Sequence, residues 1–231
     1  MTQKAVGIIG GMGPDATLEL MRRVMDATPA QDDPDHIRML VDNNPKIPSR
    51  LKAILDNSGD NPGPVIAKMA KGLEQAGADF LVMPCNTVHY YLDYVEQAVE
   101  IPVWNLIRLS LSYIHEHYPV KRVGILASTA SQQINLFGPV LEEFGLEAVY
   151  PDQATQALVM QVIMAVKAGQ LSDALVDEYN HQIAQMPDVE LYLLGCSELS
   201  VARKRHHQQV PVVDALQVLA EAIVAECIGQ S

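Results

Sequence analysis

Two stretches share one plan: FLVMPCNT at residues 80–87 and YLLGCSEL at residues 192–199. In each, a short apolar run leads to a cysteine that is followed by small polar residues. Short apolar runs bounded by turn residues are typical of strands buried in a parallel sheet. Each cysteine is therefore expected where a buried strand ends and the next helix or turn begins.

Two further pairs of stretches follow the same order along the chain. VGIIGGMGPDAT at 6–17 parallels VGILASTASQQI at 123–134, and IPVWN at 101–105 parallels VPVVD at 210–214. Each pair by itself is a weak signal. Three pairs of matching segments, in the same order and at similar intervals along the chain, predict two similar lobes.

The signals for strands and helices alternate along the chain. This alternation predicts an α/β protein with two pseudo-symmetric Rossmann-like lobes, each a mainly parallel sheet flanked by helices, and a cleft between the lobes. The first lobe is expected to comprise residues 1–103 and 209–231, and the second lobe residues 104–208. Helices are expected at 15–27, 65–76, 88–98, 131–144, 155–168, 172–185 and 215–227, and extended segments at 5–9, 37–41, 80–83, 103–106, 123–127, 148–150, 191–194 and 210–213. On the first helix, Leu18, Met21, Val24 and Met25 form the expected buried stripe.

Composition excludes several classes of protein. The chain has 231 residues, is 48% hydrophobic and 19% charged, and carries a formal net charge of −12. An apolar content of this size argues against global disorder, and the acidic balance argues against a nucleic-acid partner. No apolar run is long enough to span a membrane, and three scattered cysteines fit neither a disulfide scaffold nor a metal site. A cytoplasmic protein without metal is expected.

The paired cysteines have a specific chemical use. Ligands of open parallel sheets bind beyond the carboxyl ends of the strands, where Cys85 and Cys196 are expected. If the two lobes face each other, a bound molecule lies between two thiols. One thiolate could then remove a proton from a carbon while the other thiol delivers a proton to the opposite face, which inverts the stereocentre.

Several of these residues can also be explained without a catalytic role. Buried cysteine is a common core residue, and Cys227, on the last helix, is assigned to the core. His89, four residues after Cys85, could share its helix face and tune it, but an exposed helix face is the expectation. The turn Gly10-Gly11-Met12-Gly13 lacks the full dinucleotide fingerprint, because Asp15 stands where a glycine is needed. It is expected as a tight turn at the cleft edge, with its amides near a carboxylate. Pyridoxal phosphate is disfavoured, because Lys167 has no phosphate cradle beside it.

The segments MPCNT at 83–87, GCSEL at 195–199 and GIIGGMGPDAT at 7–17 resemble the aspartate/glutamate racemase superfamily. Ser197 and Glu198 stand where glutamate racemases usually carry a threonine-histidine pair, so the resemblance is to the aspartate racemase branch. It implies a cofactor-independent, two-base racemase of an acidic amino acid that forms a homodimer.

The resemblance also implies roles for individual residues. Cys85 and Cys196 match the two catalytic cysteines, Asn86 and Thr87 hold the amino-acid end of the substrate, and Arg50 and Lys167 engage carboxylates. The expected substrate contacts are Met12, Arg50, Asn86, Thr87, Ser128, Lys167 and Ser197.

Two other functions stay open at this point. Related superfamily members isomerise or decarboxylate small dicarboxylic acids with one or both cysteines. A protein that binds a small dicarboxylate without turning it over would also fit the cationic residues Arg50 and Lys167.

Overall fold

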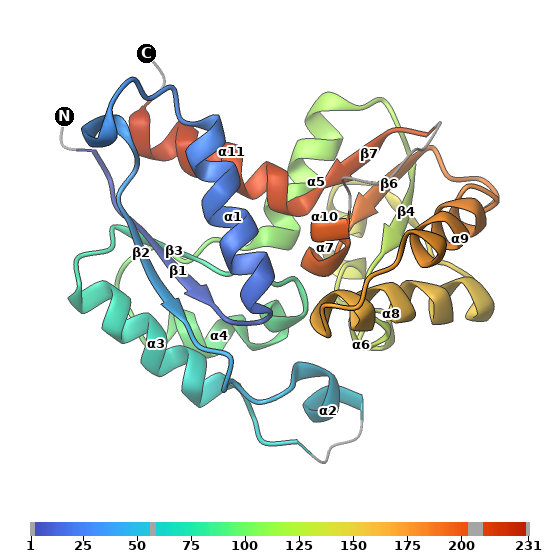
Figure 1. Cartoon of the computed structure of the whole chain (residues 1–231), viewed down its shortest axis with the longest axis horizontal. Helices are drawn as coiled ribbons and strands as arrows, with labels where there is room; N and C mark the ends of the chain where they lie inside the picture. The colour runs from blue at the N-terminus through green and yellow to red at the C-terminus, as the bar shows by residue number, and fades with distance from the viewer. Residues whose placement is uncertain (1–2, 56–58, 203–209, 230–231) are drawn as a thin grey trace. The chain divides into compact units, whose positions relative to one another are not determined.

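The computed structural model describes residues 3–55, 59–202 and 210–229. The chain divides into two compact units, which are Met1–Leu106 with Leu216–Ser231 (unit 1) and Ile107–Ala215 (unit 2). Each unit contains one parallel sheet with helices around it (Figure 1), as the α/β prediction requires. The domain boundary expected at 208/209 lies outside the described residues.

The sheet of unit 1 has three parallel strands: β1 (Val6–Gly10), β2 (Met39–Asn43) and β3 (Phe80–Val82). Their order is β2-β1-β3, and Val103 adds a single parallel bridge to Leu81 of β3. All residues of β1 are buried, which explains its uninterrupted apolar sequence. The chain steps from β1 out to β2 and then back across β1 to β3, so the strand order reverses between β1 and β3.

Two long helices pack on this sheet. Both α1 (Pro14–Ala27) and α3 (Gly63–Gln75) contact β1 and β2, and Figure 1 shows them on opposite sides of the strands. This placement follows from the reversal of strand order, because right-handed connections that run in opposite directions cover opposite faces. The other helices that lie wholly or mostly in this unit are η1 (Asp33–Asp35), α2 (Arg50–Leu55), η2 (Thr87–Tyr91), α4 (Leu92–Glu96) and α11 (Ala215–Ile228).

The sheet of unit 2 confirms the internal repeat. Its strands are β4 (Arg122–Leu126), β5 (Glu147–Val149), β6 (Leu191–Leu194) and β7 (Val212–Asp214), in the order β5-β4-β6-β7. The first three correspond to β1, β2 and β3 in sequence order and in sheet order. β7 borders β6 as Val103 borders β3, which is the relation expected from the stretches 210–214 and 101–105.

One strand departs from the expected division of the chain. The sequence analysis placed residues 209–231 with the first lobe, but β7 pairs with β6, with Val212 opposite Tyr192 and Asp214 opposite Leu194. Ladder pairing with β6 makes this strand part of the second sheet. The chain returns to unit 1 only with α11, from Leu216 onward.

Three helices of unit 2 begin with side-chain caps. The Asp152 side chain accepts a hydrogen bond from the Thr155 amide at the start of α8, and Ser128 and Ser172 cap α6 and α9 in the same way. The helices are α5 (Leu106–His117), whose first residue falls in unit 1, α6 (Thr129–Gln133), α7 (Gly138–Glu143), α8 (Gln153–Lys167), α9 (Asp173–Ile183) and α10 (Ser197–Ala202). Within the described ranges, no helix is both long and apolar enough to cross a bilayer.

Three expected segments differ in the structure. The helix expected at 131–144 is broken between α6 and α7, because Asn135 takes a left-handed conformation with φ of 50°. The helix expected at 88–98 is the 3-10 segment η2 followed by α4, because Tyr91 leaves the helical region with φ −109° and ψ 20°. Of the extended segment expected at 103–106, Val103 alone forms a bridge, and α5 already begins at Leu106.

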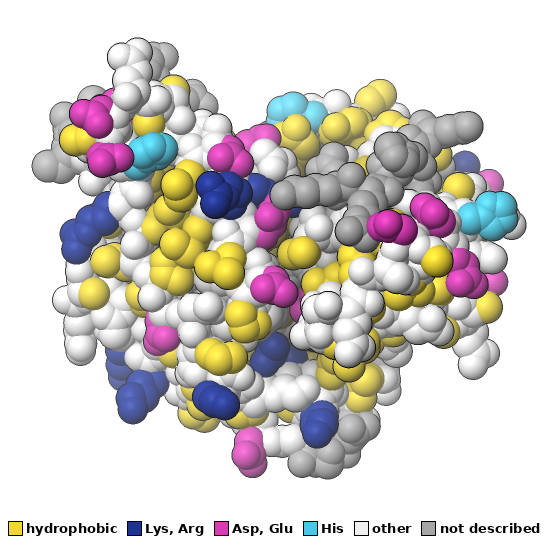
Figure 2. All heavy atoms as spheres, viewed as in Figure 1, with side chains coloured by type: hydrophobic (Ala, Val, Ile, Leu, Met, Phe, Trp, Pro, Cys, Tyr) yellow, Lys and Arg dark blue, Asp and Glu magenta, His cyan; other side chains and the backbone are white. Residues whose placement is uncertain are grey.

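The buried face of α1 agrees with the prediction only in part: Val24 is fully buried as expected, but two other residues of the expected stripe are exposed. Leu18 is 58% exposed and Met25 is 39% exposed, and Figure 2 shows hydrophobic side chains gathered over α1. The face toward the sheet carries Thr17 instead. Its hydroxyl accepts a hydrogen bond from the Gly11 amide at 3.0 Å, and a Cβ on Gly10 would lie 2.5 Å from the Thr17 side chain. This close approach sets the rotation of the helix.

Candidate active site

The carboxyl ends of β1 and β3 form the candidate site of unit 1. They lie side by side where the strand order reverses, which is the place where open parallel sheets bind ligands. Cys85 follows β3, and its amide donates to the Met83 carbonyl at 2.8 Å. The residue is 7% exposed and belongs to the hydrophobic core of the unit.

A tight turn follows β1 at the same edge of the sheet. Gly11 has φ of +92°, and a Cβ there would lie 2.3 Å from the carbonyl group of Asn44. A glycine is therefore required for the turn to pack against the segment after β2. Met12 is buried and packs in the same core cluster as Cys85.

Asn86 and Thr87 lie where η2 begins, directly after Cys85, and both are buried. The Asn86 Oδ1 atom has no hydrogen-bond partner among the described residues. A buried polar atom left without a partner destabilises a protein by about 1–3 kcal/mol. Such an atom beside the candidate thiol is suited to accept a hydrogen bond from a ligand.

His89 is buried, which corrects the expectation of an exposed position. Its Nε2 atom accepts a hydrogen bond from the Leu106 amide at 3.0 Å, so the proton of the neutral ring is on Nδ1. Nδ1 lies 2.9 Å from the Cys85 carbonyl and donates to it. Burial lowers the pKa of His89, which keeps the ring neutral. His89 thus ties the Cys85 turn to the start of α5.

Arg50 is the first residue of α2 and is half-buried. Its Nη1 atom donates to the Pro48 carbonyl at 2.8 Å and to the Ile47 carbonyl at 3.4 Å. Burial raises the pKa of Tyr91, and the positive charge of Arg50 acts in the opposite direction. Arg50 is thus close enough to Tyr91 on η2 for its charge to affect the pKa of that residue.

Unit 2 repeats this arrangement. Cys196 follows β6 and Ser128 follows β4, at the corresponding reversal of strand order. The Gly195 amide donates to the Leu126 carbonyl at 2.8 Å, which holds the two strand ends together. Ser128 is buried, and its hydroxyl lies 3.0 Å from that of Ser131.

The surroundings of Cys196 hold a charged pair. Cys196 is 8% exposed, and its Sγ atom donates to Glu198 Oε2 at 2.9 Å. The other carboxylate oxygen, Oε1, lies 3.4 Å from Lys167 Nζ at the end of α8. Lys167, which the sequence analysis assigned to a substrate carboxylate, thus faces a buried glutamate in this structure.

Ser197 lies between Cys196 and Glu198 and begins α10. Its hydroxyl is buried and has no hydrogen-bond partner among the described residues. Each unit therefore places, directly after its cysteine, a buried polar atom that has no hydrogen-bond partner in the described part of the chain: Asn86 Oδ1 in unit 1 and Ser197 Oγ in unit 2.

The sequence reasoning missed two residues at these sites. Glu198 was considered only as a departure from the threonine-histidine pair of glutamate racemases, although a carboxylate two positions after a candidate thiol, at a helix start, is close enough to bond to it. The burial of His89 has no comparable signal in the sequence, because its partners Cys85 and Leu106 meet only in the fold.

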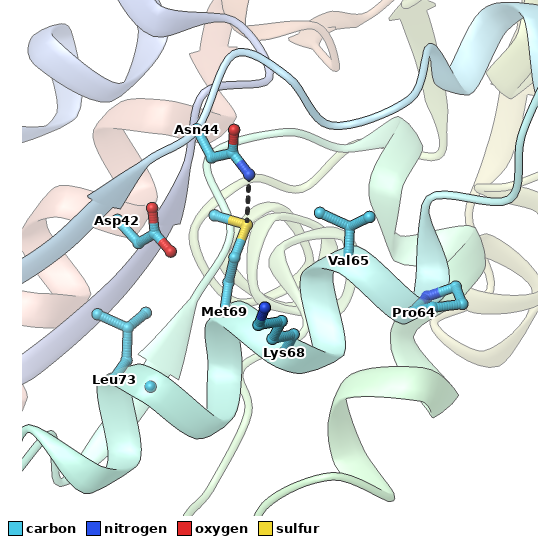
Figure 3. Close-up of a pocket in the computed structure, with 8 residues that line it drawn as sticks. Asp42, Asn44, Pro64, Val65, Lys68, Met69 and Leu73 are labelled. Atoms are coloured by element: carbon cyan, nitrogen blue, oxygen red, sulfur yellow. Dashed lines mark hydrogen bonds between the residues drawn. The ribbon is translucent and has the colours of Figure 1, made fainter.

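A separate cavity of roughly 720 Å³ lies between β2 and α3 in unit 1 (Figure 3). Asp42 and Lys68 contribute charges to its lining, and the Asn44 amide points at Met69 Sδ across 3.7 Å. Of the described residues that line this cavity, none is among the site residues expected from the sequence.

Comparison with known proteins identifies the family. Residues 9–223 match the Asp/Glu/Hydantoin racemase family. The chain belongs to this family. The match covers both units and both cysteines, and it agrees with the resemblance seen in the sequence motifs.

Relatives cover nearly the whole length of this family member. The broad specificity amino-acid racemase RacX of Bacillus subtilis (strain 168) is 28% identical over 227 residues, which are 95% of this chain and 96% of RacX. Picrophilus torridus aspartate racemase is 30% identical with a TM-score of 0.83, covering 97% of this chain and 94% of its own. Family membership and these relatives indicate an amino-acid racemase.

A second solved structure agrees in fold. A putative Asp/Glu racemase from Yersinia pestis has a TM-score of 0.79 at 22% identity, covering 97% of this chain and 99% of its own. The two-unit α/β architecture is therefore shared among these proteins.

Proposed function

We propose that this racemase acts on an acidic amino acid, aspartate or glutamate, and moves a proton at the α-carbon between Cys85 and Cys196 without a cofactor. The observation that carries the proposal is the matching position of the two thiols. Each follows the end of a strand where the order of its own parallel sheet reverses, and each is followed by a buried polar atom that has no hydrogen-bond partner among the described residues.

In the proposed reaction the two cysteines act on opposite faces of one carbon. The thiolate of one cysteine takes the α-proton, and the thiol of the other gives its proton to the opposite face. One proton leaves the substrate and one arrives, so the total charge of the two sulfur atoms is unchanged. Asn86 and Ser197 are proposed to hold the amino-acid end of the substrate, together with Thr87, Ser128 and Met12.

An acidic substrate also needs positive charge in a chain of net charge −12. Arg50 is the proposed partner of one carboxylate, because a guanidinium binds a carboxylate through two hydrogen bonds. Lys167 is proposed to add positive charge at the other cysteine. We also propose a cytoplasmic location and a homodimer. Light scattering of the purified chain would test the dimer.

The test is exchange of the α-hydrogen in D₂O. Each enantiomer of aspartate and glutamate is incubated with the protein, and deuterium at the α-carbon and the opposite enantiomer are measured by mass spectrometry and chiral chromatography. Neutral amino acids belong in the panel, because RacX is described as a broad specificity enzyme. Deuterated product of the opposite hand from aspartate or glutamate is expected.

Absence of deuterium and of inversion with every acidic amino acid would contradict the proposal. Turnover of maleate or a malonate instead would favour an isomerase or decarboxylase. Thermal stabilisation by succinate without any turnover would favour a binding protein.

A further inference from the structure

The Glu198 carboxylate contacts the Cys196 sulfur directly. The residue is 5% exposed, one oxygen accepts the Cys196 S–H at 2.9 Å, and the other faces Lys167. We propose that Glu198 is a positioning residue that keeps the proton on Cys196 in the resting protein, so that Cys196 starts the reaction as the acid and Cys85 as the base. The assignment of acid and base rests on the proposed racemase function.

The hydrogen bond fixes where the proton lies. An ionised carboxylate can only accept, so the shared proton belongs to the sulfur. Loss of that proton would leave two negative charges on atoms 2.9 Å apart in a site that is largely closed to water. Because burial weakens the screening of such repulsion, the thiol form of Cys196 is favoured.

Lys167 makes this arrangement possible. A buried carboxyl group without a counter-charge would take up a proton itself, and it could then donate a hydrogen bond to a thiolate. The Lys167 ammonium lies 3.4 Å from Glu198 Oε1 and supplies that counter-charge. Its side chain is 34% exposed, so the cation keeps part of its hydration while the anion is buried.

Within the part of the chain that the structure describes, the other titratable groups near α10 do not compensate for Glu198. Burial raises the pKa of Tyr179 on α9, and the charge of Cys196 raises it further, so this phenol stays neutral. Asp214 on β7 accepts a hydrogen bond from the Ser200 hydroxyl of α10 at 2.6 Å. Neither group brings a positive charge to the sulfur.

Cys85 has different neighbours. Among the described residues, no carboxylate forms a hydrogen bond with its sulfur, and the adjacent His89 is a neutral ring that contacts the Cys85 carbonyl. The two thiols therefore differ in the resting protein although the units share one topology. After one turnover Cys85 holds the proton and Cys196 is a thiolate beside Glu198, and repulsion then favours return of the proton to Cys196.

Alkylation by iodoacetamide measures this difference directly, because only the thiolate reacts. The full chain is treated over a range of pH, and modification of each cysteine-containing peptide is followed by mass spectrometry. In the unmodified sequence we expect Cys85 to react at lower pH than Cys196. Burial raises the pKa of Cys227 to about 11, so this cysteine serves as an unreactive internal reference.

The decisive variant is Glu198→Gln, which keeps the shape of the side chain and removes its charge. We expect the pH midpoint of Cys196 alkylation to fall by about one unit, which is roughly a tenfold faster reaction at neutral pH. The midpoint of Cys85 should stay in place. Glu198→Asp keeps the charge and should restore most of the original midpoint. The matched control is Glu142→Gln, which removes an exposed carboxylate from α7.

An unchanged Cys196 midpoint in Glu198→Gln, or an equal shift in Glu142→Gln, overturns the proposal. If the Glu198 variants do not fold, alkylation of the unmodified sequence decides: Cys196 reacting at the same pH as Cys85, or below it, overturns the proposal. The alkylation experiment needs no turnover. A shifted midpoint without racemase activity would refute the proposed function alone, and activity with an unshifted midpoint would refute the role of Glu198 alone.

Discussion

Ser197 and Ser200 are buried hydroxyls on the same short helix, and they differ in their hydrogen bonds. The Ser197 hydroxyl has no partner among the described residues, whereas Ser200 donates to Asp214. A side chain that is buried at a stability cost and lies next to a candidate catalytic thiol is best explained by a ligand that completes its hydrogen bonds.

This contrast predicts opposite results for two alanine variants. Ser197→Ala should leave the free energy of unfolding unchanged or raise it by up to about 1 kcal/mol, while kcat/KM falls about tenfold through loss of one substrate hydrogen bond. Ser200→Ala should lower the free energy of unfolding by about 1–3 kcal/mol, because it leaves Asp214 without that donor. Urea denaturation and steady-state kinetics measure both. Equal destabilisation by the two variants would contradict a ligand-binding role for Ser197.

At the scale of elements, η2 is attached to α5 through one neutral histidine. Burial lowers the pKa of His89, and its Nε2 atom must stay unprotonated to accept from the Leu106 amide. In the unfolded chain the ring takes up a proton below about pH 6.5. The unfolded state therefore binds more protons than the folded state under these conditions, and the folded state loses stability as the pH falls.

We predict that the difference in the free energy of unfolding between the unmodified chain and His89→Gln depends on pH. The contribution of His89 is fully present above about pH 6.5, and it declines by up to about 1.4 kcal/mol per pH unit between the unfolded and the folded pKa. The variant lacks this titration, so the difference in the free energy of unfolding should shrink from pH 7.5 to pH 5. Urea denaturation at several pH values checks this, and parallel stability curves would argue against the buried neutral ring.

An added methyl group should change the free energy of unfolding in opposite directions at Gly10 and at Gly72. At Gly10 a Cβ would lie 2.5 Å from the Thr17 side chain, so Gly10→Ala should lower the free energy of unfolding by about 1–3 kcal/mol. Gly72 is inside α3 and has no heavy atom within 4 Å of the added position, so Gly72→Ala should raise it by about 0.5–1 kcal/mol. Chemical denaturation compares the two. A stabilising Gly10→Ala would show that α1 does not approach β1 as described.

The sequence predicted the elements that depend on local pattern. Leu191–Leu194 is a strand of four apolar residues and is fully buried, as its composition requires. Asn135 shows the limit of such reasoning, because a helical pattern runs through a residue that adopts a left-handed conformation. Leu18 shows another limit, since apolar spacing favoured one face of α1 and the hydrogen bond between Gly11 and Thr17 selected a different one.

The candidate site, like the fold, could be predicted only where the local sequence pattern determines it. The position of Cys85 and Cys196 at strand ends follows from apolar runs that stop at a cysteine, and the structure confirms it for each unit. The contact of Glu198 with both Cys196 and Lys167 depends on how α8 packs against α10, which no local pattern encodes. The approach of the two cysteines to one substrate stays a prediction.

At the scale of the whole molecule, the proposed two-base reaction uses one cysteine from each unit. Cys85→Ala and Cys196→Ala should each abolish racemisation, and one of them is expected to keep exchange of the α-proton with solvent for a single enantiomer. Cys227→Ala is the control: it should lower the free energy of unfolding by about 1 kcal/mol and leave the kinetics unchanged. Chiral chromatography and deuterium incorporation measure these outcomes. Full racemase activity in either of the first two variants would exclude the two-base reaction.

Leu216–Ser231, which belongs to unit 1 and includes most of α11, follows the whole of unit 2 in the chain. The Lys4 side chain near the amino terminus pairs with Glu226 of this helix. During synthesis on the ribosome, residues 107–215 emerge as one continuous piece, while unit 1 is complete only after residues 216–231 have emerged. Unit 2 can thus fold before unit 1. A premature stop codon before α11 would leave unit 1 without this helix, although most of unit 1 is translated first.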